Sequence, residues 1–213
     1  LSVEFNGDIS LDEVSMDVGI PLKKIKGVTR MAGKYNEDKL SSLDMSIAFE
    51  EMSTLGRTIT DVAGSLEFNP REKQFVFNGM RGESSSGGVT VGGWIALDDT
   101  KEYEIEILIA GVELATGDGE GVVASLQGEL RGLFSIAGVR GDSDSRRGVG
   151  RIRVENGHLE IDPFSLTTMR VLQLAFPSAK TITGAEIDLY IKGDTIILEE
   201  ITLRSSETDI TDF

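Results

Sequence analysis

Apolar and polar side chains alternate with a period of two along most of this chain. Between Asp44 and Glu50, the apolar residues Met45, Ile47 and Phe49 take every second position. Because successive side chains leave a β-strand on opposite faces, this pattern predicts a strand with one apolar and one solvated face. The same alternation recurs at 74–78, 102–109 and 185–192, where the alternating apolar residues are Phe75, Phe77, Tyr103, Ile105, Ile107, Ile109, Ala185, Ile187, Leu189 and Ile191.

Short groups of turn-forming residues lie between these segments. They are Asn6-Gly7-Asp8, Asn36-Glu37-Asp38, Asn69-Pro70-Arg71-Glu72, Asp98-Asp99-Thr100, Asn156-Gly157 and Gly193-Asp194. Asn-Gly and Gly-Asp favour two-residue hairpins, since positive φ costs little there, so residues 148–161 are predicted to form a strand pair. Short connections imply antiparallel neighbours. We therefore predict a mainly β protein with an elongated, curved antiparallel sheet, either a β-groove or an open, barrel-like meander.

One segment has helical periodicity. Asp162 is a suitable N-cap, and Pro163 suits the first helical position. Apolar residues then recur every three or four positions from about residue 164 to residue 174, and Pro177 ends the segment. We predict a short amphipathic helix that plugs an open end or edge of the sheet. Its apolar stripe consists of Leu166, Met169, Leu172 and Phe176.

The chain divides into two predicted segments that can form one continuous domain. Residues 1–115 read as a repetitive antiparallel β-sheet, and residues 116–213 as a second β segment that contains the helix. Two glycine-rich polar stretches, Thr116–Glu120 and Arg140–Gly148, are predicted to be loops or hinges.

Composition narrows the possible functions. The chain has 213 residues with 25 glycines and 4 prolines, which suits many short strands and tight turns. Its net charge of −15 repels phosphate backbones, so we expect no nucleic-acid partner. The chain has no cysteine, which excludes disulfides and thiolate sites. No apolar run is long enough to predict a transmembrane helix.

The sequence offers no catalytic signature. His158 is the single histidine, so a histidine-based triad or a multi-histidine metal site cannot form within the chain. Asp142-Ser143-Asp144 lacks the later ligands of a calcium loop, and Gly117–Gly121 lacks the helix that a phosphate cradle needs. We therefore expect no enzyme activity, no metal and no cofactor.

The order of several glycine-containing motifs resembles the C-terminal region of AsmA-like envelope proteins, relatives of TamB and of the bridge-like lipid-transfer proteins. The motifs are Asp61-Val62-Ala63-Gly64-Ser65-Leu66, Gly87-Gly88-Val89-Thr90-Val91-Gly92-Gly93-Trp94-Ile95, Gln127-Gly-Glu-Leu-Arg-Gly132 and Gly148-x-Gly150-x-Ile152-x-Val154-x-x-Gly157-x-Leu159. In that family the last motif leads into a proline-started helix and two amphipathic strands, as it does in this sequence.

This resemblance implies a non-enzymatic protein of the periplasm or cell envelope of a double-membrane bacterium. Phospholipid or another acyl lipid would bind along an apolar β-groove, supporting lipid transport between membranes or outer-membrane assembly. The family's membrane-anchoring helix is not among these residues, so an anchor is expected in a segment absent from this chain. Membrane or outer-membrane proteins are further candidate partners. The candidate groove residues are Phe75, Phe77, Ile105, Ile107, Ile109, Ile187, Leu189 and Ile191.

Two alternatives remain open at the level of sequence. A structural or assembly scaffold with a sealed apolar core would show the same alternation as a groove. A carbohydrate-binding or carbohydrate-active β-helix would need aromatic side chains along a polar cleft. With one tryptophan and three tyrosines, the chain supplies few of them.

Overall fold

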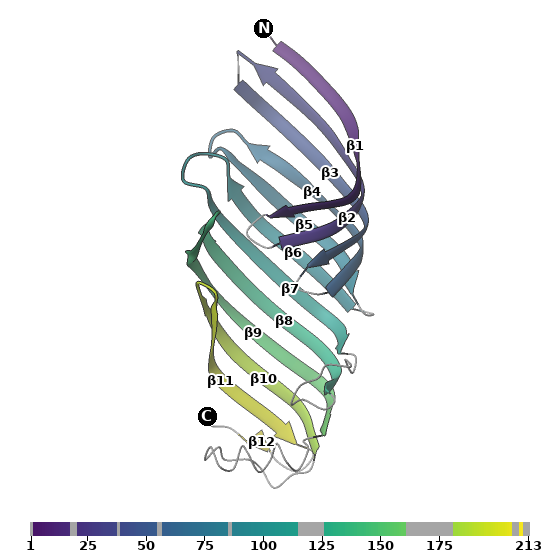
Figure 1. Cartoon of the computed structure of the whole chain (residues 1–213), viewed down its shortest axis with the longest axis vertical. Helices are drawn as coiled ribbons and strands as arrows, with labels where there is room; N and C mark the ends of the chain where they lie inside the picture. Colours follow the sequence, from purple (N-terminus) through teal and green to yellow (C-terminus); the bar gives the residue numbers. More distant parts are fainter. Residues whose placement is uncertain are drawn as a thin grey trace.

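The structure is a single antiparallel β-sheet whose strands follow one another in chain order (Figure 1). It is a computed structural model, and it describes residues 2–17, 21–37, 39–54, 57–84, 87–114, 126–160, 181–205 and 209–210. The strands are β1 (Ser2–Asp17), β2 (Pro21–Asn36), β3 (Lys39–Thr54), β4 (Arg57–Asn69), β5 (Gln74–Ser84), β6 (Gly87–Ala96), β7 (Glu102–Leu114), β8 (Leu126–Val139), β9 (Asp142–Glu160), β10 (Thr181–Lys192), β11 (Thr195–Ser205) and the two-residue β12 (Asp209–Ile210).

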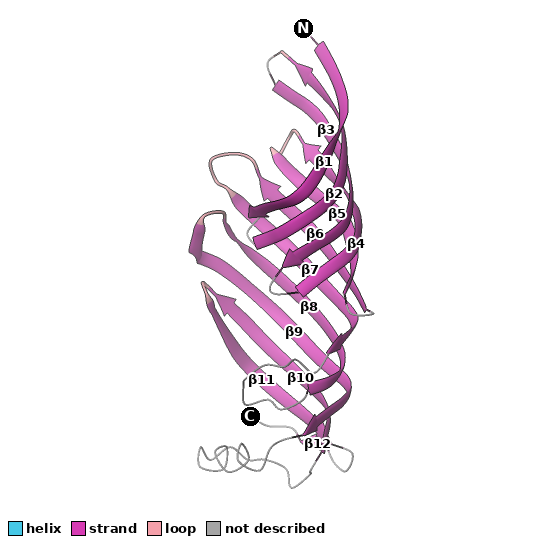
Figure 2. Cartoon of the chain, turned by 45° about the vertical axis from the view of Figure 1, so that its right-hand side comes forward, coloured by secondary structure: helices cyan, strands magenta, loops and turns pink. Residues whose placement is uncertain are grey.

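The sheet forms one layer. Among the described residues, extensive contacts join only consecutive strands, and Figure 2 shows no second sheet packed against the first. Figures 1 and 2 show an elongated, curved sheet, with β1 near the N-terminal end and β11 near the C-terminal end. The prediction of a mainly β protein with an open, curved antiparallel sheet is confirmed. The predicted helix, with Leu166, Met169, Leu172 and Phe176, lies outside the described residues.

Bulges mark the places where strands bend. Glu13, Lys24, Asp61 and Asn156 have φ values of 52°, 52°, 52° and 53°, and each lies at a shift in the pairing register of its strand. An extra residue in one strand bends that strand and increases its local twist. Bulges in β1, β2, β4 and β9 therefore help the sheet to curve.

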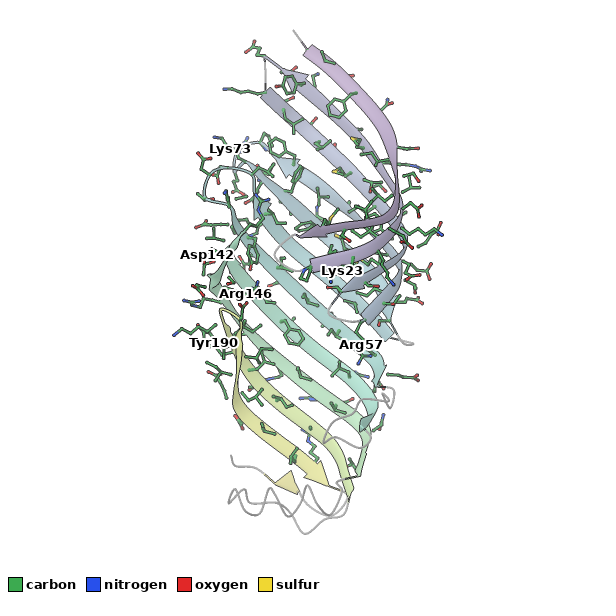
Figure 3. All side chains as sticks on the ribbon, in the orientation of Figure 1. Lys23, Arg57, Lys73, Asp142, Arg146 and Tyr190 are labelled. Carbon is green, nitrogen blue, oxygen red and sulfur yellow. The ribbon has the colours of Figure 1, made fainter. Side chains whose placement is uncertain are left out.

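Hydrogen bonds connect the hairpin turns to one another at one end of the strands. The Leu97 amide donates to the Lys73 carbonyl at 2.8 Å, and the Arg140 amide donates to the Lys101 carbonyl at 2.9 Å. Further along, the Gly193 amide donates to the Arg146 carbonyl at 2.9 Å. Figure 3 places Lys73, Asp142 and Arg146 at this end of the strands. The connections predicted at 69–72, 98–100 and 193–194 are confirmed, and a turn at Glu37 agrees with the prediction at 36–38.

Three local predictions were wrong. Asn6-Gly7-Asp8 lies within β1, where regular pairing with Ala32, Met31 and Arg30 of β2 outweighs local turn preference. Asn156-Gly157 does not form a hairpin, because residues 142–160 are a single strand, β9. The positive φ of Asn156 belongs to a bulge within this strand. Of the predicted loop 140–148, only Arg140 and Gly141 form a turn; the remainder is strand.

Candidate functional site: the apolar face of the sheet

One row of mutually paired residues crosses all eleven long strands without a polar side chain. In chain order the row is Gly7, Met31, Met45, Leu66, Phe77, Gly93, Ile105, Ile136, Gly148, Ile191 and Ile196. A second row on the same side contains Gly82, Val89, Ile109, Gly132, Ile152, Ile187 and Ile201. We call the side of the sheet on which both rows lie the apolar face. With strands spaced by about 4.8 Å, ten intervals extend this face over roughly 48 Å.

The apolar face closes on itself in the N-terminal part of the sheet. Ile25, Phe49 and Val62 are 0%, 6% and 3% exposed and belong to one buried cluster. Phe75, Phe77 and other half-buried side chains pack against this cluster. Because no described second layer covers these strands, such deep burial requires the sheet to curl over its own apolar face. From β2 to β4, the apolar face is a sealed core.

Beyond the curl, coverage of the apolar face is uneven. Ile107, Ile136, Ile152 and Ile187 are half-buried, and Ile196 on β11 is 62% exposed. Other residues on the same face are buried: Val112, Val154 and Leu189 are 4%, 7% and 5% exposed. A smaller buried cluster of Ile95, Tyr103 and Ile105 lies between the two regions, and Ile107 and Ile136 pack against it. Apolar surface therefore remains to be buried at the half-buried isoleucines of β7 to β10 and on β11, and also on the edge strand β1, where Val3 and Ile9 are 47% and 42% exposed. We call the part of the face from β7 to β11 the open region.

Glycine leaves room for an aromatic ring on this open region. A Cβ on Gly150 would lie 2.6 Å from Phe134 Cδ1, and a Cβ on Gly132 would lie 3.0 Å from Phe134 Cε2. The ring of Phe134 therefore lies beside Gly132 of its own strand and over Gly150 of the neighbouring strand β9.

The structure places every strand residue predicted for the groove on the apolar face. Phe75 and Phe77 come from β5, and Ile105, Ile107 and Ile109 from β7. Phe77 packs against the small cluster that contains Ile105. The β10 residues Ile187, Leu189 and Ile191 form a separate group, because β8 and β9 lie between β7 and β10.

Sequence reasoning missed several residues that connect these groups. Ile136 and Phe134 of β8 and Ile152 of β9 complete the open region. Their alternation was interrupted by Gly132, Gly148 and Gly150, which contribute no apolar side chain to the pattern. Ile25 was missed because it stands among Lys23, Lys24 and Lys26, where Lys24 forms the bulge. If glycine is treated as an apolar residue, the alternation at 130–136 in β8 and 148–154 in β9 is uninterrupted, and the sequence then predicts their apolar face.

The opposite face carries the charges. Across β8 to β11, arginines and carboxylates alternate in a ladder of exposed and partly exposed ion pairs. The contacts are Arg131–Glu129 at 2.8 Å, Arg131–Glu155 at 3.5 Å, Arg153–Glu186 at 3.0 Å, Arg204–Glu186 at 3.5 Å and Arg151–Asp188 at 2.6 Å. Arg151 binds both carboxylate oxygens of Asp188, and this hydrogen bonding lowers the pKa of Asp188. The same contact raises the pKa of Arg151.

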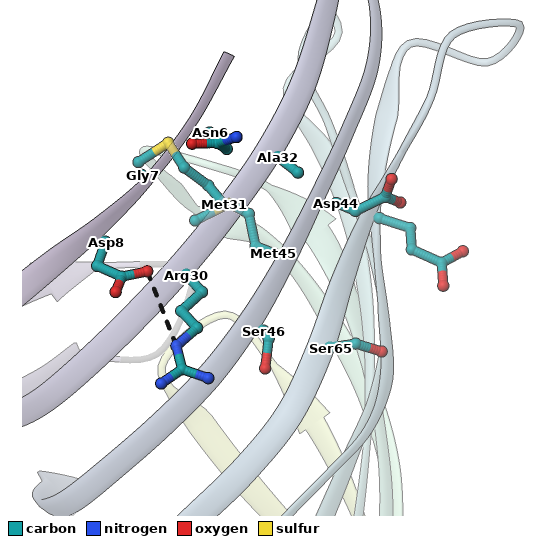
Figure 4. A pocket seen from close by; sticks show the side chains of 11 residues that line it. Asn6, Gly7, Asp8, Arg30, Met31, Ala32, Asp44, Met45, Ser46 and Ser65 are labelled. Atoms are coloured by element: carbon teal, nitrogen blue, oxygen red, sulfur yellow. Dashed lines mark ion pairs between the residues drawn. The ribbon is translucent and has the colours of Figure 1, made fainter. Parts of the chain in front are cut away.

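A shallow depression of about 730 Å³ lies over β1 to β4 (Figure 4). Its polar lining includes Asp8, Arg30, Asp44 and Glu67, and Asp8 pairs with Arg30 at 3.8 Å. With three carboxylates and one guanidinium already paired, the depression does not favour an anionic ligand. It also lacks a nucleophile–base pair with which to perform chemistry.

The described residues contain no group of three or more histidines, cysteines, aspartates or glutamates placed to bind a metal ion. His158 lies in β9 in register with Gln127 of β8. In the same described part of the chain, no helix is both long and apolar enough to cross a membrane.

Comparison with known proteins leaves the resemblance described above as a prediction. No protein-family model, no curated protein and no solved structure matches this chain.

Proposed function

We propose that this chain is a non-enzymatic lipid-binding protein that holds the acyl chains of phospholipid along the open region of its apolar face. The supporting observation is the row of paired residues from Gly7 to Ile196, which crosses eleven strands without a polar side chain. Apolar surface that stays in water is costly, and each methylene buried against it contributes about 0.8 kcal/mol. An acyl chain lying across β7 to β11 would cover this surface without a charged anchor.

The AsmA-like resemblance supplies the proposed setting. In that setting the protein acts in the envelope of a double-membrane bacterium, where it carries phospholipid between membranes or supports outer-membrane assembly. The polar face, with its ladder of ion pairs, would remain in water while the apolar face contacts lipid.

The second candidate is a structural or assembly scaffold with a sealed core and no ligand. The observation that favours it is the N-terminal curl, where Ile25 is 0% exposed and the sheet buries its own apolar residues. The two candidates differ only in whether the open region binds lipid. In a scaffold, the side chains of β7 to β11 would bind no lipid.

Substitutions on opposite faces of the same strand separate the candidates. Ile136→Glu and Ile152→Glu place charges on the apolar face of β8 and β9, at half-buried positions. Leu133→Glu and Val149→Glu introduce the same charges on the opposite face of the same two strands, at positions 57% and 58% exposed. Both double variants would be checked for native β-structure by circular dichroism. Bound phospholipid would then be quantified by mass spectrometry after incubation with phosphatidylglycerol and phosphatidylethanolamine vesicles.

We expect lipid to bind the wild-type chain and the Leu133→Glu/Val149→Glu control, and not the folded Ile136→Glu/Ile152→Glu variant. A wild-type chain that takes up no phospholipid would refute lipid binding by this chain and favour the scaffold. Equal binding by both double variants would mean that lipid associates elsewhere on the protein. If the apolar-face variant unfolds, brominated acyl chains and methyl NMR contacts to Ile136 and Ile152 of the wild type provide the same distinction.

A further inference from the structure

Between Val3 and Leu11, the N-terminal edge strand of the sheet lacks the bulges, prolines and inward-facing charges that normally prevent another strand from pairing with it. β1 extends over 16 residues, and no described strand pairs with its outer side. It contains no lysine, arginine or proline, and no charged residue lies on its apolar face between Val3 and Leu11. Natural edge strands are usually short, interrupted, or protected by inward-facing charges, so β1 presents an unprotected row of backbone donors and acceptors.

The exposure of the apolar face also points to a missing neighbour at this edge. Val3 and Ile9 on β1 are 47% and 42% exposed. In the same row as Ile9, Thr29 on β2 and Ile47 on β3 are buried. The side chain of this row is therefore exposed on the edge strand and buried on the next two strands. A strand added outside β1, with its apolar residues on the same face, would cover Val3 and Ile9 in the same way.

The charges on the opposite face indicate the chemistry of that strand. β1 carries Glu4, Asp8 and Asp12 at four-residue spacing, while β2 carries Lys26, Arg30 and Lys34 at the same spacing. Glu4 pairs with Lys34 at 3.1 Å, and Asp8 pairs with Arg30 at 3.8 Å. One strand further in, Glu50 of β3 pairs with Lys26 at 3.5 Å. The sign of the charge thus alternates over β1 to β3, although not beyond, because Asp44 of β3 lies opposite Glu67 of β4. A strand that faces the carboxylates of β1 should be cationic.

We propose that β1 is the docking site for an antiparallel β-strand from outside these 213 residues, with apolar residues on one face and lysine or arginine every fourth residue on the other. A second copy of this chain does not fit this description. Another β1 would set carboxylates opposite carboxylates. At the other end of the sheet, β12 pairs with β11 only at Leu203 and Arg204, and the remainder of β11 carries Glu199 and Glu200. Strand addition supplies affinity through main-chain hydrogen bonds and selectivity through alternate side chains.

The sequence of β2 provides a probe, because β2 already satisfies one side of β1. A capped synthetic peptide with the sequence of residues 21–36, added to the full chain, should bind β1 with saturable 1:1 stoichiometry by fluorescence anisotropy. Hydrogen exchange should slow at alternate amides of β1, those that do not donate to β2.

Peptide backbone modification tests whether binding uses main-chain hydrogen bonds. An antiparallel strand at an edge pairs through one of its two alternating sets of amides. N-methylation of one set in the probe should abolish binding, and N-methylation of the other set should leave it intact. Simple attraction between a cationic peptide and an acidic protein would not distinguish the two sets.

Matched charge variants test the location. The Glu4→Lys/Asp8→Lys variant should bind the probe at least about tenfold more weakly, because two attractive cross-strand pairs become repulsive. The Glu199→Lys/Glu200→Lys variant makes the same change in net charge at the opposite edge and should bind as the wild type does. No saturable binding, equal loss in both charge variants, or indifference to both N-methylated peptides would overturn the proposal. The N-methylated peptides are tested on the wild-type chain, so they remain decisive even if a charge variant fails to fold.

Discussion

At the residue scale, burial on the apolar face separates the side chains that stabilise the fold from those available to a ligand. Ile25 is 0% exposed in the N-terminal core, whereas Ile196 on β11 is 62% exposed. We expect Ile25→Ala to lower the free energy of unfolding by about 2–4 kcal/mol, since the cavity adds to the lost transfer free energy. The control Ile196→Ala should change it by less than about 0.5 kcal/mol. Urea unfolding followed by circular dichroism measures both, and equal effects would contradict the assignment of the core.

The contact between Arg151 and Asp188 leads to a prediction about pH. Arg151 Nε and Nη2 lie 2.6 Å and 2.8 Å from the two Asp188 carboxylate oxygens. These hydrogen bonds hold the pKa of Asp188 below its ordinary value of 3.8. The contact therefore contributes to stability above that ordinary pKa, and the contribution is lost as the pH falls through the lower pKa of the folded state.

An NMR titration of the Asp188 carboxyl carbon tests this contact. Arg151→Gln should raise the pKa of Asp188 toward the ordinary value, because the charged double donor is lost. Arg146→Gln serves as the control, since Arg146 pairs with Asp194 instead. An Asp188 pKa that is the same in the wild type and in Arg151→Gln would show that the contact is not maintained in solution.

At the scale of the element, the bulge in β9 depends on a residue that tolerates the left-handed region. Asn156 has a φ of 53°, and β9 continues through it for 19 residues in all. Asn156→Val should destabilise the protein by about 1–2 kcal/mol, because a β-branched side chain is strained at positive φ. Asn156→Gly should be tolerated. Asn78→Val in β5 makes the same chemical change at an exposed strand residue outside the positive-φ set. Its loss in thermal stability should be clearly smaller than that of Asn156→Val.

The same bulge shows how far the sequence can predict this fold. Alternation alone predicted the strands around Ile47, Phe77, Ile105 and Ile187, because the two-residue period is local. The Asn156-Gly157 pair correctly indicated positive φ but not its use, since a hairpin turn and a bulge place the same demand on the backbone. Only the long-range pairing of β9 with β8 and β10 decides between them.

Prediction of the candidate site had a related limit. Side chains such as Phe77, Ile105 and Ile187 could be assigned to an apolar face from their own strands. The register that aligns Ile105 with Ile136, and Ile152 with Ile187, depends on pairing between strands. The division into a sealed N-terminal curl and an open region from β7 to β11 depends on curvature. Curvature here is associated with bulges at Glu13, Lys24 and Asp61, residue types that ordinarily signal only a solvated surface.

At the scale of the whole molecule, a one-layer sheet with neighbour-to-neighbour contacts should behave as a linear array. Among the described residues, extensive contacts join only consecutive strands. In such a structure, a substitution in one strand destabilises the adjacent strands and has little effect on the stability of more distant strands. Stability should therefore vary along the sheet. The curled N-terminal part, with its large buried cluster, should be the more stable end.

Native-state hydrogen exchange can test this behaviour with two substitutions at opposite ends of the apolar face. Ile187 pairs with Ile152 and Ile201, so Ile187→Ala should accelerate exchange in β9 to β11 and leave β2 to β4 unchanged. Phe49→Ala, within the N-terminal cluster, should accelerate exchange in β2 to β4 and leave β10 and β11 unchanged. Uniform acceleration across the sheet in either variant would instead mean that the strands unfold as one cooperative unit. If exchange is regional, the open region can loosen to admit an acyl chain while the N-terminal core stays folded, which is the mechanical requirement of the proposed function.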